Sequence, residues 1–183
     1  HSFNSLSLLA GASTIQTKYG FLGGRNEQYH ILKFDSDSSV IELDNNYFYT
    51  NGTGDYSDSL TIDKLYLYSN TRIYGTNTID SIFINYPTGY LGFQEDKIQT
   101  ITGGFATSNN CESPVLIASF TKEYQNSGFN IFSTNKTATL TKTSGNMLLF
   151  NTVIKGINAS GGANFSAQNS YDAGNNIGWN LLG

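Results

Sequence analysis

The residues that could do chemistry in this chain are mostly acidic and lie in one stretch. Six carboxylates between positions 35 and 58 fall in a segment without Lys or Arg: Asp35, Asp37, Glu42, Asp44, Asp55 and Asp58. Glycoside hydrolases commonly use two carboxylates about 5 to 10 Å apart, but nothing in the spacing selects one pair. A calcium ion takes six to eight oxygen ligands, and Asp35 and Asp37 could supply some. The stretch predicts a solvated loop face, with a calcium site at Asp35 and Asp37 as the alternative.

Other kinds of catalysis lack the residues they need. Nucleophilic catalysis of the Ser-His-Asp kind requires a histidine base, and only His1 and His30 are present, with no nucleophile motif beside them. The single cysteine, Cys111, excludes an internal disulfide and a cysteine-rich zinc site, and we expect it to be a small buried hydrophobe. The sequence therefore predicts a protein without catalytic residues and with no cofactor other than calcium, and a polysaccharide-active enzyme is the alternative.

The elements that would position these residues are short β-strands. No window of eleven residues has convincing 3.6-residue periodicity, so almost no helix is expected. Runs rich in β-branched and aromatic residues, often bounded by Gly, Asn, Asp or Ser, predict strands. The predicted strands are residues 3–9, 30–34, 40–43, 47–50, 60–68, 72–75, 79–86, 90–93, 98–102, 115–120, 129–133, 138–143, 147–155, 163–167 and 177–182.

A short string of an apolar residue, Asn or Asp, a third residue and another apolar residue recurs at 3–6, 62–65, 79–82 and 150–153. Segments 62–75 and 79–92 superpose at an offset of 17 residues. This offset places Leu65 on Ile82 and Ile73 on Tyr90, and Gly75 on Gly92. Self-similar short strands separated by polar turns are typical of a stacked solenoid. The repeats predict an all-β, right-handed parallel β-helix or β-solenoid, with a β-sandwich or jelly roll as the alternative.

The 183 residues suit one domain, 1–183. Residues 19–46 depart from the repeat and are expected to be an irregular insertion, and the Gly- and Asn-rich residues 156–183 to form a cap. Because the chain starts inside a strand-like pattern, we expect it to be part of a longer protein. Trp179 is expected to cover the open end of the core, or else to stack on a sugar.

The charge pattern limits the classes of partner that the chain is expected to bind. The ten basic residues are dispersed and the net charge is −4, whereas phosphate binding needs clustered cations, so nucleic acid is not expected. No long apolar run is present, so no membrane insertion is expected. Exposed aromatic residues could bind carbohydrate or a partner, although several could be outward-facing side chains that only support a sheet. The aromatic candidates are Tyr66, Tyr68, Tyr74, Tyr86, Tyr90 and Trp179.

The chain from Lys97 onward carries a series of motifs. They are Gln-Thr-Ile-Thr-Gly at 99–103, Asn-Cys-Glu at 110–112, Ile-Asn-Ala-Ser-Gly-Gly-Ala at 157–163 and Asp-Ala-Gly-Asn-Asn-Ile-Gly-Trp-Asn at 172–180. This region resembles a C-terminal module of large, secreted, repetitive surface proteins of Bacteroidota-type bacteria. The likeness covers about half of the chain and is most specific at the Asn-Asn-x-Gly-Trp ending.

The resemblance implies a β-helix segment of an exported adhesin or stalk at the bacterial cell surface, often exported by the type IX route. Its partners would be neighbouring domains of the same long chain or other surface proteins, and carbohydrate. An accessory subunit of a cell-surface machine is a further alternative. The family supplies no catalytic residues. Asp58-Ser59-Leu60 and Asp80-Ser81-Ile82 match the string that such bacteria O-glycosylate, which makes Ser59 and Ser81 candidate modification sites.

Overall fold

The described part of the chain is all-β. The computed structural model describes residues 13–17, 39–43, 47–48, 61–67, 71–73, 75–85, 89–107, 112–121 and 135–182, and for 13–17, 39–43 and 47–48 only the backbone. No helix occurs in these ranges, so none of them holds a helix that could cross a membrane. All strand pairs among them are parallel.

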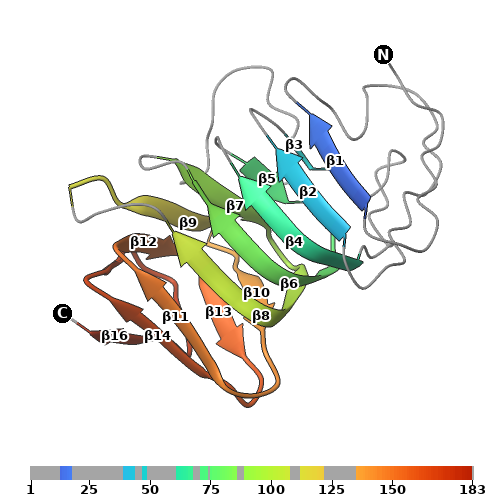
Figure 1. Cartoon of the computed structure of the whole chain (residues 1–183). Helices are drawn as coiled ribbons and strands as arrows, with labels where there is room; N and C mark the ends of the chain where they lie inside the picture. Colours follow the sequence, from blue (N-terminus) through green and yellow to red (C-terminus); the bar gives the residue numbers. More distant parts are fainter. Residues whose placement is uncertain are drawn as a thin grey trace.

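The strands form three sheets (Figure 1). The first sheet, in spatial order, contains β1 (Ser13–Thr17), β2 (Ser39–Leu43), β4 (Thr61–Leu67), β6 (Asn77–Ile84), β8 (Ile98–Thr107), β10 (Ala138–Thr141) and β13 (Ile157–Ser160). The second contains β15 (Tyr171–Asp172), β12 (Thr152–Lys155), β9 (Val115–Phe120), β7 (Tyr90–Gln94), β5 (Thr71–Ile73) and β3 (Tyr47–Phe48). The third contains β11 (Asn146–Phe150), β14 (Asn164–Gln168) and β16 (Asn180–Leu182).

Consecutive strands visit the sheets in turn. From β4 to β9 the chain alternates between the first and second sheets, and from β10 it visits all three. We call one such passage a circuit. Each strand of a circuit pairs with the equivalent strand of the circuit before it, so the sheets are built from strands far apart in sequence.

Alternation along the strands accounts for the core. Successive side chains of a strand point to opposite faces, and in β6 the buried positions are Asn77, Ile79, Ile82 and Ile84. The apolar ones stack on the circuits beside them, and Ile79 lies in register between Ile62 and Ile101. All three are at most 1% exposed, and full burial of each such side chain contributes roughly 1.5–3 kcal/mol. The core therefore consists of columns of like residues.

The predicted stacking of the second and third strings is confirmed in the first sheet. Leu65 pairs with Ile82, and Leu67 with Ile84. The same offset was wrong in the second sheet, where Ile73 pairs with Phe93 rather than Tyr90, and Gly92 pairs with Arg72 rather than Gly75. Six residues separate Ile84 from Leu91, whereas three separate their partners Leu67 and Thr71, so the register shifts by three between the two sheets.

The string at 150–153 does not stack on the other two. Phe150 ends β11 and Thr152 begins β12, with Asn151 between them in the left-handed region at φ 51°. The single strand predicted over 147–155 is therefore two strands that meet at a corner. The string at 3–6 and the strands predicted at 3–9, 30–34 and 129–133 lie outside the described residues.

Most other predicted strands have counterparts, with shifted ends, and β8 is longer than predicted. Strands β1, β13 and β15 were missed, because their sequences are short or rich in small and polar residues. Within residues 19–46, where an irregular insertion was expected, Ser39–Leu43 is strand β2, which pairs with β1 and β4.

A buried polar corner joins the second sheet to the first. The Gln94 side-chain oxygen accepts a hydrogen bond from the Gly75 amide at 2.9 Å, and the Gln99 side chain donates to the Gly75 carbonyl at 2.6 Å. Asn77 Nδ2 donates to Gln99 Oε1 at 2.9 Å. The side-chain amides of Gln94 and Gln99 thus bond to the backbone N–H and C=O of Gly75, which lie at the turn between the two sheets. These backbone groups therefore have hydrogen-bond partners although the corner is buried.

Lys142 closes a second corner. Strand β8 carries one extra residue where Thr102 and Gly103 together oppose Asp80 of β6. The pairing of β8 with β10 ends at Thr100, and the Lys142 ammonium donates to the carbonyls of Thr102 and, at 2.6 Å, Gly103. Lys142 is only 7% exposed. Its amine thus takes the place of strand amides where the chain turns from β10 towards β11.

Candidate functional site

The outer face of the second sheet carries a stripe of apolar side chains. Tyr90 of β7 pairs with Leu116 of β9, Leu116 with Val153 of β12, and Val153 with Tyr171 of β15. The first three are half-buried, and Tyr171 is 68% exposed. Neighbouring strands are ~4.8 Å apart, so the four side chains form a continuous line across four circuits. We call these four residues the tyrosine stripe.

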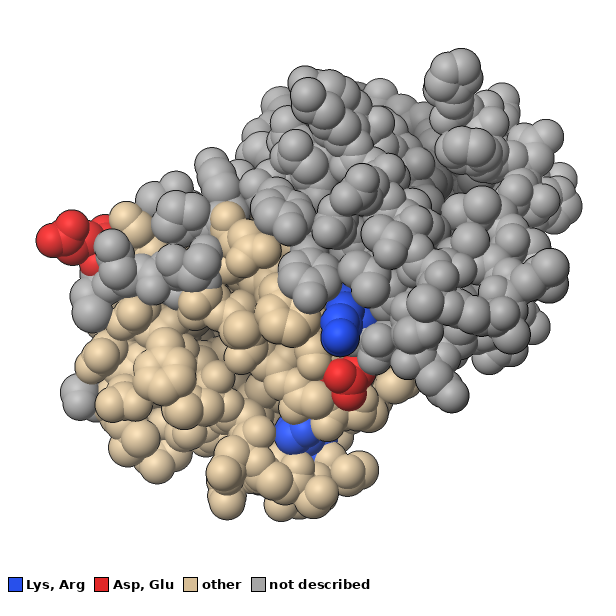
Figure 2. Space-filling model, viewed as in Figure 1, with Lys and Arg blue, Asp and Glu red and all other residues tan. Residues whose placement is uncertain are grey.

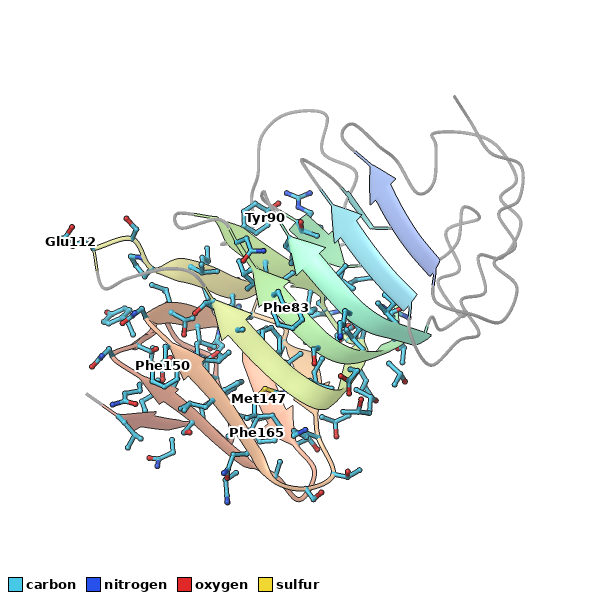
Figure 3. The ribbon with its side chains drawn as sticks, viewed as in Figure 1. Phe83, Tyr90, Glu112, Met147, Phe150 and Phe165 are labelled. Carbon is cyan, nitrogen blue, oxygen red and sulfur yellow. The ribbon has the colours of Figure 1, made fainter. Side chains whose placement is uncertain are left out.

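Tyr90 is held at one end of the tyrosine stripe by its neighbours. Arg72 Nε donates a hydrogen bond to the Tyr90 hydroxyl at 2.9 Å. The Arg72 guanidinium carbon lies 5.5 Å from the centre of the Phe120 ring, which is only 2% exposed. Phe120 fits against Gly92, because a Cβ there would lie 2.9 Å from the ring. Figure 3 shows Tyr90 at the edge of the described part.

The stripe has the chemistry of a contact surface. Tyrosine rings offer apolar faces and a polar edge, which suits sugar rings and protein side chains. Of the predicted tyrosines, only Tyr90 has a described side chain. The backbone of Tyr66 lies in β4, opposite Phe83, and Tyr68, Tyr74 and Tyr86 lie outside the described residues. Sequence reasoning missed Leu116, Val153 and Tyr171, because only the strand register brings them into line with Tyr90.

Trp179 covers the end of the core. Its ring meets Phe165 edge-on, with centroids 5.3 Å apart and planes at 79°. The indole N–H donates to the Ile157 carbonyl at 3.1 Å. Phe165 in turn pairs with Met147 of β11, as Figure 3 shows. The half-buried indole is thus engaged with Phe165 of the core and with the backbone of β13.

Ser81 lies in a network around one carboxylate. Ser81 Oγ donates to Asp80 Oδ2 at 2.8 Å, and Thr102 Oγ1 donates to Asp80 Oδ1 at 2.8 Å. Gly103 leaves room for this network, because a Cβ on it would lie 2.6 Å from Ser81 Oγ. The Ser81 hydroxyl is therefore half-buried and committed to a hydrogen bond, and Ser59 lies outside the described residues.

The acidic stretch of the sequence falls largely outside the described residues, Asp35 and Asp37 included, and Glu42 is placed only by its backbone in β2. In the part that is described, no three His, Cys, Asp or Glu residues lie close enough to hold a metal ion. The ion pair between Lys136 Nζ and Asp96 Oδ2 spans 2.7 Å, with both side chains more than 60% exposed. The hydrogen bond from Asp96, its negative charge and that of Glu95 raise the pKa of Lys136 above its ordinary value.

Comparison with protein-family models, curated proteins and solved structures finds no match for this chain. Its function has to be argued from its own residues. The geometry offers a column-packed interior, a capped end and the tyrosine stripe.

Proposed function

We propose that this chain is a non-catalytic, right-handed parallel β-solenoid module of an exported bacterial surface protein, acting as a stalk or adhesive segment. The observation that carries the proposal is the parallel, in-register stacking of successive circuits, typified by Leu65 on Ile82. A sandwich or jelly roll is built from antiparallel strands, so the parallel pairing favours the solenoid. The resemblance of the C-terminal half to modules of Bacteroidota-type surface proteins supports the bacterial surface as its location.

Such a module works by being stiff. Every inner strand of the described sheets bonds to a circuit on each side. Repeat proteins of this kind gain stability from each interface between neighbours. The low share of charged residues, 13%, means that this stability depends little on ion pairs. Figure 2 shows only a few charged groups on the described part of the face it presents.

The adhesive contact in this proposal is the tyrosine stripe. Its ligand is carbohydrate or another surface protein, as expected for an adhesin. Tyr171, the most exposed member, and Tyr90, held by Arg72, would provide the stacking faces. Loss of one aromatic contact is worth about 1 kcal/mol, or about fivefold in affinity.

A glycan array combined with a polysaccharide-degradation assay tests the proposal. We expect binding without product, weakened by Tyr171→Ala and unchanged by Ser166→Ala on the outer face of the third sheet. Release of product would contradict it in favour of the carbohydrate-active enzyme. Binding only to a protein complex from the native envelope, found by pull-down, would favour the accessory subunit of a surface machine.

The solenoid itself has a separate test. A crystal structure or a cryo-electron map should have the strands of successive circuits stacked along one axis with right-handed crossovers. Crossovers of the opposite hand, or antiparallel sheets, would refute the solenoid without bearing on the glycan result.

A further inference from the structure

Hydroxyl side chains form a row on the outer face of the first sheet. Thr78 of β6 pairs with Thr100 of β8, Thr100 with Thr141 of β10, and Thr141 with Ser160 of β13. The backbone of Thr61 in β4 extends the row by one position. The threonines are half-buried and Ser160 is exposed. The residues on either side of Thr100 and Thr141 are all buried: Gln99, Ile101, Leu140 and Lys142. We call Thr78, Thr100, Thr141 and Ser160 the hydroxyl row.

Within the described part of the chain, the hydroxyl groups of this row make no hydrogen bond that holds the fold together. None of the four donates or accepts a side-chain hydrogen bond with another described residue. Other hydroxyls nearby behave differently, since those of Ser81 and Thr102 are both donated to Asp80. A line of hydroxyls that the protein leaves available is suited to a ligand with regularly spaced oxygen atoms.

A second row runs beside the first, two positions earlier in each strand. It consists of Ile98, Thr139, Asn158 and Ile177, which follow one another in register. Ile98 is 46% exposed and Ile177 is 67% exposed, so methyl groups face outward beside the hydroxyls. Branching at Cβ restricts the side-chain rotamers of threonine and isoleucine. Apart from the Asn158 amide, which donates to Thr137 Oγ1 at 2.7 Å, the two rows therefore form a stiff array of methyl and hydroxyl groups.

The chemistry of the two rows limits the class of ligand that they can bind. Neither contains a charged or an aromatic residue, so the array matches an uncharged ligand and has no ring on which a sugar could stack. Of the charged groups beside the rows, Asp80 and Lys142 are engaged in the hydrogen bonds described above, and Lys97 directly precedes Ile98. The repeat along each row is fixed at ~4.8 Å by strand pairing, close to the spacing of oxygen atoms along one axis of ordinary ice.

We propose that this array binds the surface of ice. The hydroxyl row would hydrogen-bond to lattice oxygens, and the methyl groups of Ile98 and Thr139 would favour ordered water between them. The role goes beyond a stalk or a glycan adhesin and uses a different sheet from the tyrosine stripe, so the two can fail independently.

The test is incorporation of the full 183-residue chain into slowly growing ice, measured as the fraction of protein in the ice. We expect the unaltered chain to enter the ice. Thr100→Tyr and Thr141→Tyr, each of which places a bulky ring in the hydroxyl row, should be excluded. The matched control Ser166→Tyr, an outward position on the third sheet, should enter as the unaltered chain does. Far-UV circular dichroism checks folding, and Thr100→Gln serves where tyrosine perturbs it, with the same expected loss.

Exclusion of the unaltered chain from ice would overturn the proposal. Equal incorporation of Thr100→Tyr, Thr141→Tyr and the control would also overturn it, since another face would then be responsible. Binding to crystalline chitin or cellulose that depends on Thr100, without incorporation into ice, would overturn it in favour of a polysaccharide ligand.

Discussion

Replacement of Lys142 by methionine is the sharpest test of how the corner at the extra residue of β8 is held. The ammonium group donates to the carbonyls of Thr102 and Gly103, and the side chain is only 7% exposed. Methionine retains much of the apolar stem and removes both donors. The change therefore isolates the hydrogen bonds from the packing of the stem.

The expected cost follows from the exposure of the two carbonyls. A hydrogen bond to a charged group contributes about 1.5–3 kcal/mol when its partner is buried. Thr102 is exposed and Gly103 half-buried, so water can partly replace the lost donor. We therefore expect Lys142→Met to lower the free energy of unfolding by about 2 kcal/mol, below the sum of two buried bonds.

Urea unfolding followed by circular dichroism measures the effect. With a slope of about 2 kcal/mol per molar urea, the midpoint should fall by about 1 M with the slope unchanged. Lys64→Met, at an exposed position of β4, is the control and should change stability by less than about 0.5 kcal/mol. An unfolding midpoint for Lys142→Met equal to that of the control would refute the bridging role of the ammonium.

Three further outcomes are expected. Gly161→Ala should lower the free energy of unfolding by about 2 kcal/mol or more, because φ is +99° and a Cβ would lie 2.2 Å from a carbonyl oxygen of the preceding circuit. Gly104→Ala is the control and should not destabilise the chain, because a Cβ there would have nothing within 4 Å. Equal thermal unfolding midpoints for the two variants would contradict this reasoning. Trp179, the only tryptophan, should report loss of the cap at lower urea than circular dichroism reports loss of the sheets, and coincident transitions would argue against independent fraying. Asp96→Asn should return the pKa of Lys136 towards its ordinary 10.5 in an NMR titration. The contribution of this pair to stability is fully present below pH 10.5 and is lost as the pH rises through the raised pKa of Lys136. An unchanged pKa in the variant would disprove the coupling.

The part of the fold that could be predicted is the part governed by burial. Leu65, Leu67, Ile82 and Ile84 alternate with outward residues, and the demand for a common interior fixes their pairing. The register in the second sheet could not be predicted, because it depends on the number of residues in each connection. Lys142 was missed for a related reason, since a lysine is normally solvated and only the extra residue in β8 brings two carbonyls within reach of its ammonium group.

Surface features were harder to foresee than the core. The hydroxyl row joins Thr78, Thr100, Thr141 and Ser160, whose spacings in sequence differ at every step. No pattern along the chain marks them as neighbours. Trp179 was easier, because a large indole near the end of a repeating core has few other places to bury its ring.

The unequal connections between the sheets have one more consequence. Six residues lie between the paired positions Ile84 and Leu91, and only three between their partners Leu67 and Thr71, yet Ile79 remains stacked on Ile62. Differences in length are thus absorbed outside the sheets, while the core residues of the first sheet stay stacked. Foreign peptides grafted between β6 and β7 should therefore be displayed on the flank of the molecule at little cost to folding. Deletion of one residue inside β6 would instead move the side chains on one side of the deletion to the opposite face of the sheet, so that buried residues would face outward.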